Sequence, residues 1–383
     1  MENPEESLAS IEAHLSKNPQ DAAAWNIKGV LLAQKEEFGE ALRCLDQAIQ
    51  IDSKLAVAHL NRGRVLLTLG RDKARDALKS FDRALKLKPD DIDTLRDKAL
   101  ALRGLKRVDD ELAIYRRLSE LAQDESSVWL RLGDLQLEKG TMKAAIASYD
   151  TALTLKEDLV PAYIRRAMAL SIDGQFDEAI KSAETATKLD PENHEAWLIR
   201  GDVNLRAGRH RSAMKSLKKA SELDPTDASV ENTMGMVAYK DGKLSDAAKH
   251  LRRAIIRKKK YPTALRNLGL IYMEMEEWEN AVQVLEQLTS IVKNDPNAFD
   301  ALATSYARLD DFCSAEEAWE NARKFYKKVG EKKEAERVTT LNRAARINCH
   351  RMRKAEKAAR EQEKMKRTFA SRHEGKKKRK KSH

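Results

Sequence analysis

Small residues recur about every 34 residues along most of this chain, and this period limits the fold more than any other feature. Small side chains are needed where two helices cross closely. A fixed period of this length is typical of helical hairpins stacked into a solenoid. One series is glycine and a second, in step with it, is alanine: Gly29, Gly63, Gly133, Gly201, Gly235 and Gly269, with Ala41, Ala77, Ala145, Ala179, Ala213, Ala247, Ala281 and Ala315.

The stretch 194–227 shows the unit most clearly. Its first half predicts a helix that ends before Gly208, because a left-handed helix cap favours a residue without a Cβ. Ala213, Leu217 and Ala220 then follow at helical spacing on one face of a second helix. Pro225 comes just after that helix and cannot continue it. Each unit is therefore predicted to be helix, tight turn, helix and stop.

A third series places a bulky residue at the fourth position of the first helix: Trp25, Trp129, Tyr163, Trp197, Leu265 and Phe299. Together these series closely resemble the tetratricopeptide repeat (TPR) family. The resemblance implies an all-α, right-handed superhelical solenoid of about nine helix–turn–helix repeats with a concave groove. It also implies a non-enzymatic role in binding proteins. Base–glycine pairs such as Arg200–Gly201 are similar to those of archaeal members.

We expect four segments along the chain. Residues 1–21 form an N-terminal half-repeat that caps the solenoid, and residues 22–329 form the TPR solenoid. Residues 330–349 form a capping helix, with Val338, Leu341, Ala345 and Ile347 as its apolar stripe. Residues 350–383 form a long basic helix, followed from about residue 368 by a disordered tail rich in Lys and Arg.

Two repeats depart from the pattern. The second has about two extra residues between its helices, where insertions cost little. The third has Ala99 for the glycine, Glu111 for the small alanine and Leu118 for a later alanine. We therefore expect the third repeat to be the place where packing is loosest.

Composition limits the compartment. Cys44, Cys313 and Cys349 lie far apart and form no CxxC pair, so we expect three unpaired cysteines in a reducing compartment. The first ten residues are acidic and lack the apolar core of a secretory signal, and no stretch has the roughly 18 apolar residues of a membrane span. These features favour a cytoplasmic protein.

No catalytic motif stands out in the sequence. No GxxxxGK[ST], HExxH or GxSxG occurs, and the eight histidines have no Cys or His at ligand spacing. His59 takes the bulky fourth position of its repeat, which indicates a packing role. We therefore predict no enzyme, no cofactor and no metal site.

The candidate site is the groove, which in TPR proteins is lined by the first helices. Arginines there suit partner carboxylates, because a guanidinium offers two parallel hydrogen bonds. The resemblance to co-chaperones that clamp a C-terminal carboxylate ends at Asn61 and Arg165, because no trio of neighbouring repeats completes that clamp. The candidate residues for a partner peptide or helix are Asn61, Arg64, Arg96, Arg131, Arg165, Arg266 and Asn267.

Five repeats carry a base just before the glycine position, and we weigh two interpretations of it. One is a basic stripe for a ligand. The other, which we favour, is an ion pair with an acid on the second helix of the same repeat, such as Asp46, Asp82 or Glu184. The five bases are Lys28, Arg62, Lys98, Arg166 and Arg200.

The excess charge lies at the C-terminal end. Residues 350–383 hold 15 Lys and Arg against 4 Asp and Glu, a balance of +11 that equals the net charge of the whole chain. The alternative function is therefore a factor associated with RNA, DNA or a ribosome and anchored by this tail. In a eukaryotic source the same run is typical of a nuclear import signal. The run is Lys376, Lys377, Lys378, Arg379, Lys380 and Lys381.

Overall fold

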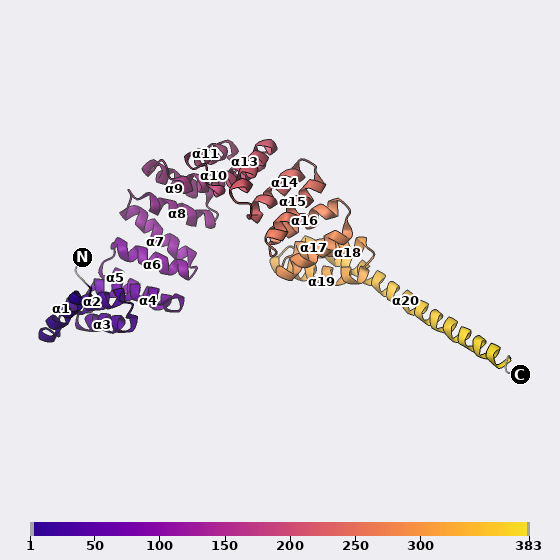
Figure 1. The fold of residues 1–383 in the computed structure, drawn as a ribbon, viewed down its shortest axis with the longest axis horizontal. Helices are drawn as coiled ribbons and strands as arrows, with labels where there is room; N and C mark the ends of the chain where they lie inside the picture. Colours follow the sequence, from indigo (N-terminus) through magenta and orange to yellow (C-terminus); the bar gives the residue numbers. More distant parts are fainter. Residues whose placement is uncertain (1–3, 381–383) are drawn as a thin grey trace. The chain divides into compact units, whose positions relative to one another are not determined.

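The computed structural model confirms the predicted all-α repeat fold. It describes residues 4–380, with side chains for residues 7–367, and this part holds twenty α-helices, one 3-10 helix and no strand. The chain divides into two compact units, Met1–Pro191 and Glu192–His383 (Figure 1). Each unit is a row of helical hairpins, in which a 13-residue first helix is followed by a second helix of 14 residues or more.

Unit 1 holds the lone helix α1 and five hairpins. The 3-10 helix η1 lies at the insertion predicted in the second repeat and takes up its extra residues. The helices are α1 Pro4–Lys17, α2 Ala22–Gln34, α3 Phe38–Ile51, α4 Ala56–Thr68, η1 Arg71–Lys73, α5 Ala74–Leu87, α6 Ile92–Gly104, α7 Val108–Leu121, α8 Ser126–Glu138, α9 Met142–Leu155, α10 Val160–Ile172 and α11 Phe176–Leu189.

Unit 2 holds four hairpins and a long C-terminal helix. Its last second helix, α19, is four residues longer than the others. The helices are α12 His194–Arg206, α13 His210–Leu223, α14 Ala228–Lys240, α15 Leu244–Arg257, α16 Pro262–Glu274, α17 Trp278–Ile291, α18 Pro296–Arg308, α19 Phe312–Val329 and α20 Lys332–Lys380.

The turn inside each hairpin has one residue in the left-handed region. Gly208 has φ +73°, as the sequence predicts. Glu36 and Lys106 occupy the same turn position with φ 64° and 58°, so glycine is not required there. A residue with a Cβ pays roughly 1–2 kcal/mol for this conformation.

The repeated glycine of the first helix is required by close packing, not by its backbone angles. A Cβ on Gly63 would lie 2.4 Å from Cε1 of the Phe81 ring, and one on Gly133 would lie 2.5 Å from the same atom of Tyr149. Both rings are fully buried. The glycine therefore lets the second helix place a large side chain directly against the first.

In three repeats the bulky fourth residue hydrogen-bonds to the backbone just before its own hairpin. The Trp25 and Trp129 indole N–H groups donate to the carbonyl oxygens six residues earlier, those of Pro19 and Gln123, both at 2.9 Å. His59 uses its Nε2 in the same way, 3.1 Å from the Ser53 carbonyl oxygen. Burial lowers the pKa of His59, which favours its neutral form and agrees with the packing role expected for it.

The bases that precede the glycine form ion pairs, but with a different partner from the one expected. For four of the five bases the acid lies on the preceding helical hairpin or cap, 16 residues earlier, and Arg166 also lies 4.0 Å from Glu178 on the second helix of its own repeat. The pairs are Lys28–Glu12 at 2.8 Å, and Arg62–Asp46, Lys98–Asp82 and Arg166–Asp150, each at 2.6 Å. These contacts therefore join consecutive repeats along unit 1.

The C-terminal helix is held on the last hairpin. Val338 and Ala345 are buried against unit 2, and the Asn342 side chain donates to the Glu316 carbonyl oxygen at 2.7 Å. Ile347, expected in the same apolar stripe, is instead half exposed. The helix also continues to Lys380, beyond the end expected near residue 367.

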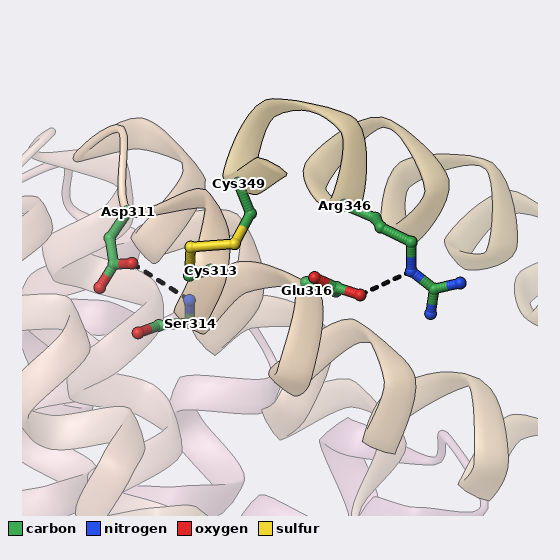
Figure 2. The surroundings of a disulfide bond; sticks show 6 residues. All are labelled: Asp311, Cys313, Ser314, Glu316, Arg346 and Cys349. Atoms are coloured by element: carbon green, nitrogen blue, oxygen red, sulfur yellow. Dashed lines mark hydrogen bonds and ion pairs between the residues drawn. A yellow bond between two sulfur atoms is a disulfide. The ribbon is translucent and has the colours of Figure 1, made fainter. Parts of the chain in front are cut away.

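The prediction of three unpaired cysteines is wrong for two of them. Cys313 of α19 and Cys349 of α20 form a disulfide, with a Cα–Cα distance of 4.8 Å (Figure 2). They are 36 residues apart, and they meet because α20 folds back along α19. Cys44 is free and buried, and burial raises the pKa of its thiol.

Replacing Gly63 by alanine should destabilise unit 1 by about 1–3 kcal/mol, because the new methyl group would overlap the buried Phe81 ring. Gly104, at the end of α6, is the matched control, since a Cβ there meets nothing within 4 Å. Gly104→Ala should gain up to about 1 kcal/mol from helix propensity. Urea unfolding of both variants measures the difference, and equal stability of Gly63→Ala and the wild type would contradict the packing described here.

Cys349→Ser should loosen only the distal part of the α20 contact. The disulfide closes a loop for which chain entropy predicts about 4 kcal/mol. Amide hydrogen exchange should rise tenfold or more over residues 346–352. Residues 335–342 should stay protected, because Val338 and Asn342 are buried independently of the disulfide.

Cys44→Ser is the control for that experiment, since Cys44 is buried but unpaired in unit 1. It should leave exchange in α20 unchanged. Equal exchange in both variants would mean that the disulfide adds nothing to docking of the helix.

Candidate functional site

The first helices form one face in each unit, which we call the first-helix face. Consecutive first helices contact one another directly, α2 with α4, α4 with α6 and α8 with α10 in unit 1, and α14 with α16 and α16 with α18 in unit 2. All seven predicted groove residues lie on these helices. Each of them is engaged by another side chain on or beside the face.

Three of the predicted residues in unit 1 have a single partner each. Asn61 donates its side-chain amide to the Asn26 oxygen at 2.9 Å. Arg64 Nε lies 2.5 Å from Asp97 Oδ2, and Arg96 forms an ion pair with Glu125. These two arginines are therefore neutralised one to one by acids on the same face.

The predicted residues in unit 2 follow the same rule. Arg266 forms an ion pair with Asp295, the residue that caps α18. Asn267 donates to the Asn232 side-chain oxygen at 3.1 Å, across the joint from α14 to α16. Neither residue carries an excess charge toward a ligand.

A different arrangement surrounds Glu111, which is only 2% exposed. Arg103 Nε of α6 lies 3.0 Å from Glu111 Oε1. Arg131 of α8 donates to the same oxygen from Nε and Nη2, at 3.0 and 2.9 Å. One buried carboxylate on α7 therefore holds two guanidinium groups, one from the first helix of its own hairpin and one from the first helix of the next.

Asp134 links this group to the next helix. Arg165 Nε of α10 lies 3.9 Å from Asp134 Oδ1, and the Tyr149 hydroxyl donates to the same oxygen at 3.1 Å. Burial raises the pKa of Asp134, opposed by the Tyr149 hydrogen bond and the neighbouring arginines. Burial also raises the pKa of Tyr149, so its hydroxyl remains a donor.

We call Arg103, Arg131, Arg165, Glu111 and Asp134 the Glu111 cluster. It brings three guanidinium groups and two carboxylates together, whereas Arg64, Arg96 and Arg266 each pair with one acid. The Arg103 and Arg131 side chains are 43% and 26% exposed. Their bonds to Glu111 and Tyr115 use only part of the five N–H donors of each guanidinium. The cluster can thus donate to a carboxylate of a ligand.

Sequence reasoning placed Arg131 and Arg165 correctly on one face but missed Glu111 as their support. It interpreted Glu111 as a defect in the third repeat. That repeat is not loosely packed, since Leu118 is fully buried. The available signal was an acid at a small-residue position, which the interior tolerates only when bases neutralise it.

The structure neither supports nor contradicts the predicted binding residues of the C-terminal tail. The tail residues Lys376, Lys377, Lys378, Arg379, Lys380 and Lys381 lie outside the part whose side chains the structure describes. Among the described residues, no group of three or more His, Cys, Asp or Glu is placed to hold a metal ion. No helix there is both long and apolar enough to cross a membrane.

Comparison with other proteins agrees with this arrangement. Residues 1–56 and 60–126 match a family model described as tetratricopeptide repeat. Residues 99–341, more than half of the chain, match the model described as cilia and flagella-associated protein 70 C-terminal domain.

Curated relatives match over shorter stretches. Protein STIP1 homolog of Dictyostelium discoideum is 36% identical over 76 residues, which is 20% of this chain and 13% of that protein. Anaphase-promoting complex subunit 7 of the same organism is 26% identical over 165 residues, 43% of this chain and 28% of that protein. The chain thus spans less than a third of the length of either relative.

Solved structures with a similar arrangement include the APC/C hetero-tetramer Cut9–Hcn1, at 19% identity and a TM-score of 0.49, covering 85% of this chain and 76% of that one. Yeast Tom70 has 14% identity and a TM-score of 0.45, covering 85% and 96%. With both family models matching its repeats, one of them over more than half of its length, the chain belongs to the tetratricopeptide repeat family.

Proposed function

We propose that this protein is a non-enzymatic scaffold that binds an acidic segment of a protein partner on the first-helix face of unit 1. The observation that carries the proposal is the Glu111 cluster, with three guanidinium groups held by two carboxylates. A partner carboxylate there would meet two or more donors at once, which gives both strength and direction.

The cluster is also prearranged for binding. A free arginine loses side-chain entropy when a ligand fixes it, at a cost of about 0.5–1.5 kcal/mol. Arg131 is already fixed by its two bonds to the buried Glu111 carboxylate. The membership of a repeat family and a relative named as a subunit of a protein complex add support for a role in protein binding.

The proposal reduces the number of predicted groove residues that are expected to bind the partner. Arg64, Arg96 and Arg266 are each neutralised by one acid and are expected to stabilise the joints between repeats. Asn61 and Asn267 pair with other amides. Arg131 and Arg165 remain as partner-binding residues, and Arg103 joins them.

Replacing Arg131 and Arg165 together by Gln should reduce partner recovery tenfold or more in an affinity purification from source extract, read by quantitative mass spectrometry. The reason is the loss of two of the three cations that would meet the partner carboxylate. Glutamine keeps a polar side chain of similar length, so Glu111 and Asp134 retain hydrogen-bond donors.

Arg64→Gln is the matched control, since Arg64 lies on the same face but is balanced by Asp97. It should change recovery less than twofold. Deletion of residues 350–383 and nuclease treatment should also leave the partner bound. If deletion or nuclease empties the resin while the double variant retains its proteins, the alternative holds and the tail anchors the protein to nucleic acid or a ribosome.

A further inference from the structure

Unit 2 contains a second candidate surface, which lies on its second helices and does not depend on the first-helix face. It is a groove of about 450 Å³ between α15 and α17. Leu268 and Tyr272 of α16 and its cap residue Met275 line the floor. Lys249, Arg252 and Ile256 of α15 form one side. Asn280, Gln283 and Gln287 of α17 lie on the other side. We call it the α15–α17 groove.

The groove lies where unit 1 has an ion pair between repeats. Arg252 occupies the same position in its repeat as Asp150 does three repeats earlier, and Leu268 corresponds in the same way to Arg166. In unit 1 that acid and that base meet at 2.6 Å. Here a base replaces the acid and a leucine replaces the base. The joint therefore has an apolar floor and a cation beside it.

Arg252 has no carboxylate within ion-pair distance in the described part of the chain; its side chain instead lies at the Tyr272 hydroxyl. Two other joints also have a base in place of the acid and an apolar residue in place of the base: Arg116 with Leu132, and Lys218 with Met234. The α15–α17 groove differs from those joints through Ile256.

Ile256 is 75% exposed, the highest value among the large apolar side chains described. Every other repeat has a polar residue at this position: Gln50, Lys86, Glu120, Thr154, Lys188, Glu222, Ser290 and Lys324. An exposed isoleucine at the edge of an apolar floor is a contact that only a partner would cover.

Charge identifies the kind of partner. Residues 252–260, at the end of α15 and beyond it, hold six Lys and Arg and no Asp or Glu, and one of the six, Arg257, pairs with Glu231 of α14 at 2.9 Å. Lys249 and Arg252 line the groove, and Lys249 pairs with Asp246 of the same helix at 3.1 Å, so Arg252 is the lining cation without an acid. The one lining carboxylate, Glu277, accepts a hydrogen bond from Asn280 at 2.7 Å. The opposite side is neutral amides. The groove thus favours a segment that is acidic on one face and apolar on the other.

We propose that the α15–α17 groove binds an acidic amphipathic helix of a protein partner. The lining of α15 runs from Ser245 to Ile256, roughly 17 Å at 1.5 Å per residue, which matches about three turns of a partner helix. Aliphatic side chains of the partner helix cover Ile256 and Leu268, and a carboxylate of the same helix pairs with Arg252. Such a helix supplies the acid that this joint lacks. A phosphate backbone fits less well, because the floor offers it no charge.

The test uses a fluorescein-labelled 18-residue helical peptide with Leu at i, i+3, i+4 and i+7 and Glu on the other face. Fluorescence anisotropy with the full-length protein at about 0.1 M salt should give saturable binding. Arg252→Glu and Ile256→Asp should each weaken it tenfold or more. Arg252→Glu should fold normally, because other repeats carry an acid there, such as Asp150 and Glu286.

Arg253→Glu is the matched control, since Arg253 is the exposed neighbour of Arg252 and does not line the groove. It should change the Kd less than twofold, and so should Arg131→Gln, which tests the first-helix face instead. A peptide with Gln in place of Glu should bind at least tenfold more weakly.

Four results of the peptide experiment would overturn the proposal. They are no saturation up to about 1 mM peptide, equal loss with Arg252→Glu and Arg253→Glu, equal affinity for the Gln peptide, and displacement of the Glu peptide by a single-stranded oligonucleotide at lower concentration than by unlabelled peptide. Self-association that is seen in sedimentation velocity and abolished by Ile256→Asp would assign the groove to a second copy of the chain and would also overturn it.

Discussion

The fold depends on one contact, repeated in most hairpins, between a glycine of the first helix and a large side chain of the second. Gly133 meets Tyr149, and Gly201 and Gly235 meet Leu217 and Leu251, at distances that leave no room for a Cβ. This contact sets how closely the two helices of a hairpin approach, because a packed interior yields little to an added methyl group. The faces available for other contacts follow from it.

The neighbouring residue of the second helix then joins one repeat to the next. Tyr149 fills the space beside the glycine of its own repeat, whereas Asp150 reaches Arg166 of the following one. Two adjacent residues thus stabilise a hairpin and link it to its neighbour. Because the contacts are local, a single repeat can change its chemistry without changing the fold. The third repeat does so with Glu111, whose charge is balanced by Arg103 of its own repeat and Arg131 of the next.

The sequence was sufficient to predict the hairpins, their period and the face on which Arg131 and Arg165 lie, because these depend on helical spacing within about 34 residues. It was not sufficient to predict which charged side chains meet. The ion pairs before the glycine were expected within one repeat, whereas Arg62 pairs with Asp46 of the preceding one. That choice depends on the offset between stacked hairpins. The Cys313–Cys349 disulfide was missed for the same reason, since it requires α20 to fold back on α19.

Equivalent positions in a stacked repeat fold face equivalent neighbours. A change of charge at one such position therefore alters the surface between two repeats without altering the fold. At Asp46, Asp82 and Asp150 an acid meets a base of the next repeat. At Arg252 the sign is reversed, the facing residue is Leu268, and the α15–α17 groove has an apolar floor with a cation beside it. The Glu111 cluster results from the opposite exchange, an acid entering a small-residue position. In both cases the helices keep their bounds and packing, so the difference between a structural joint and a binding surface lies in one or two side chains.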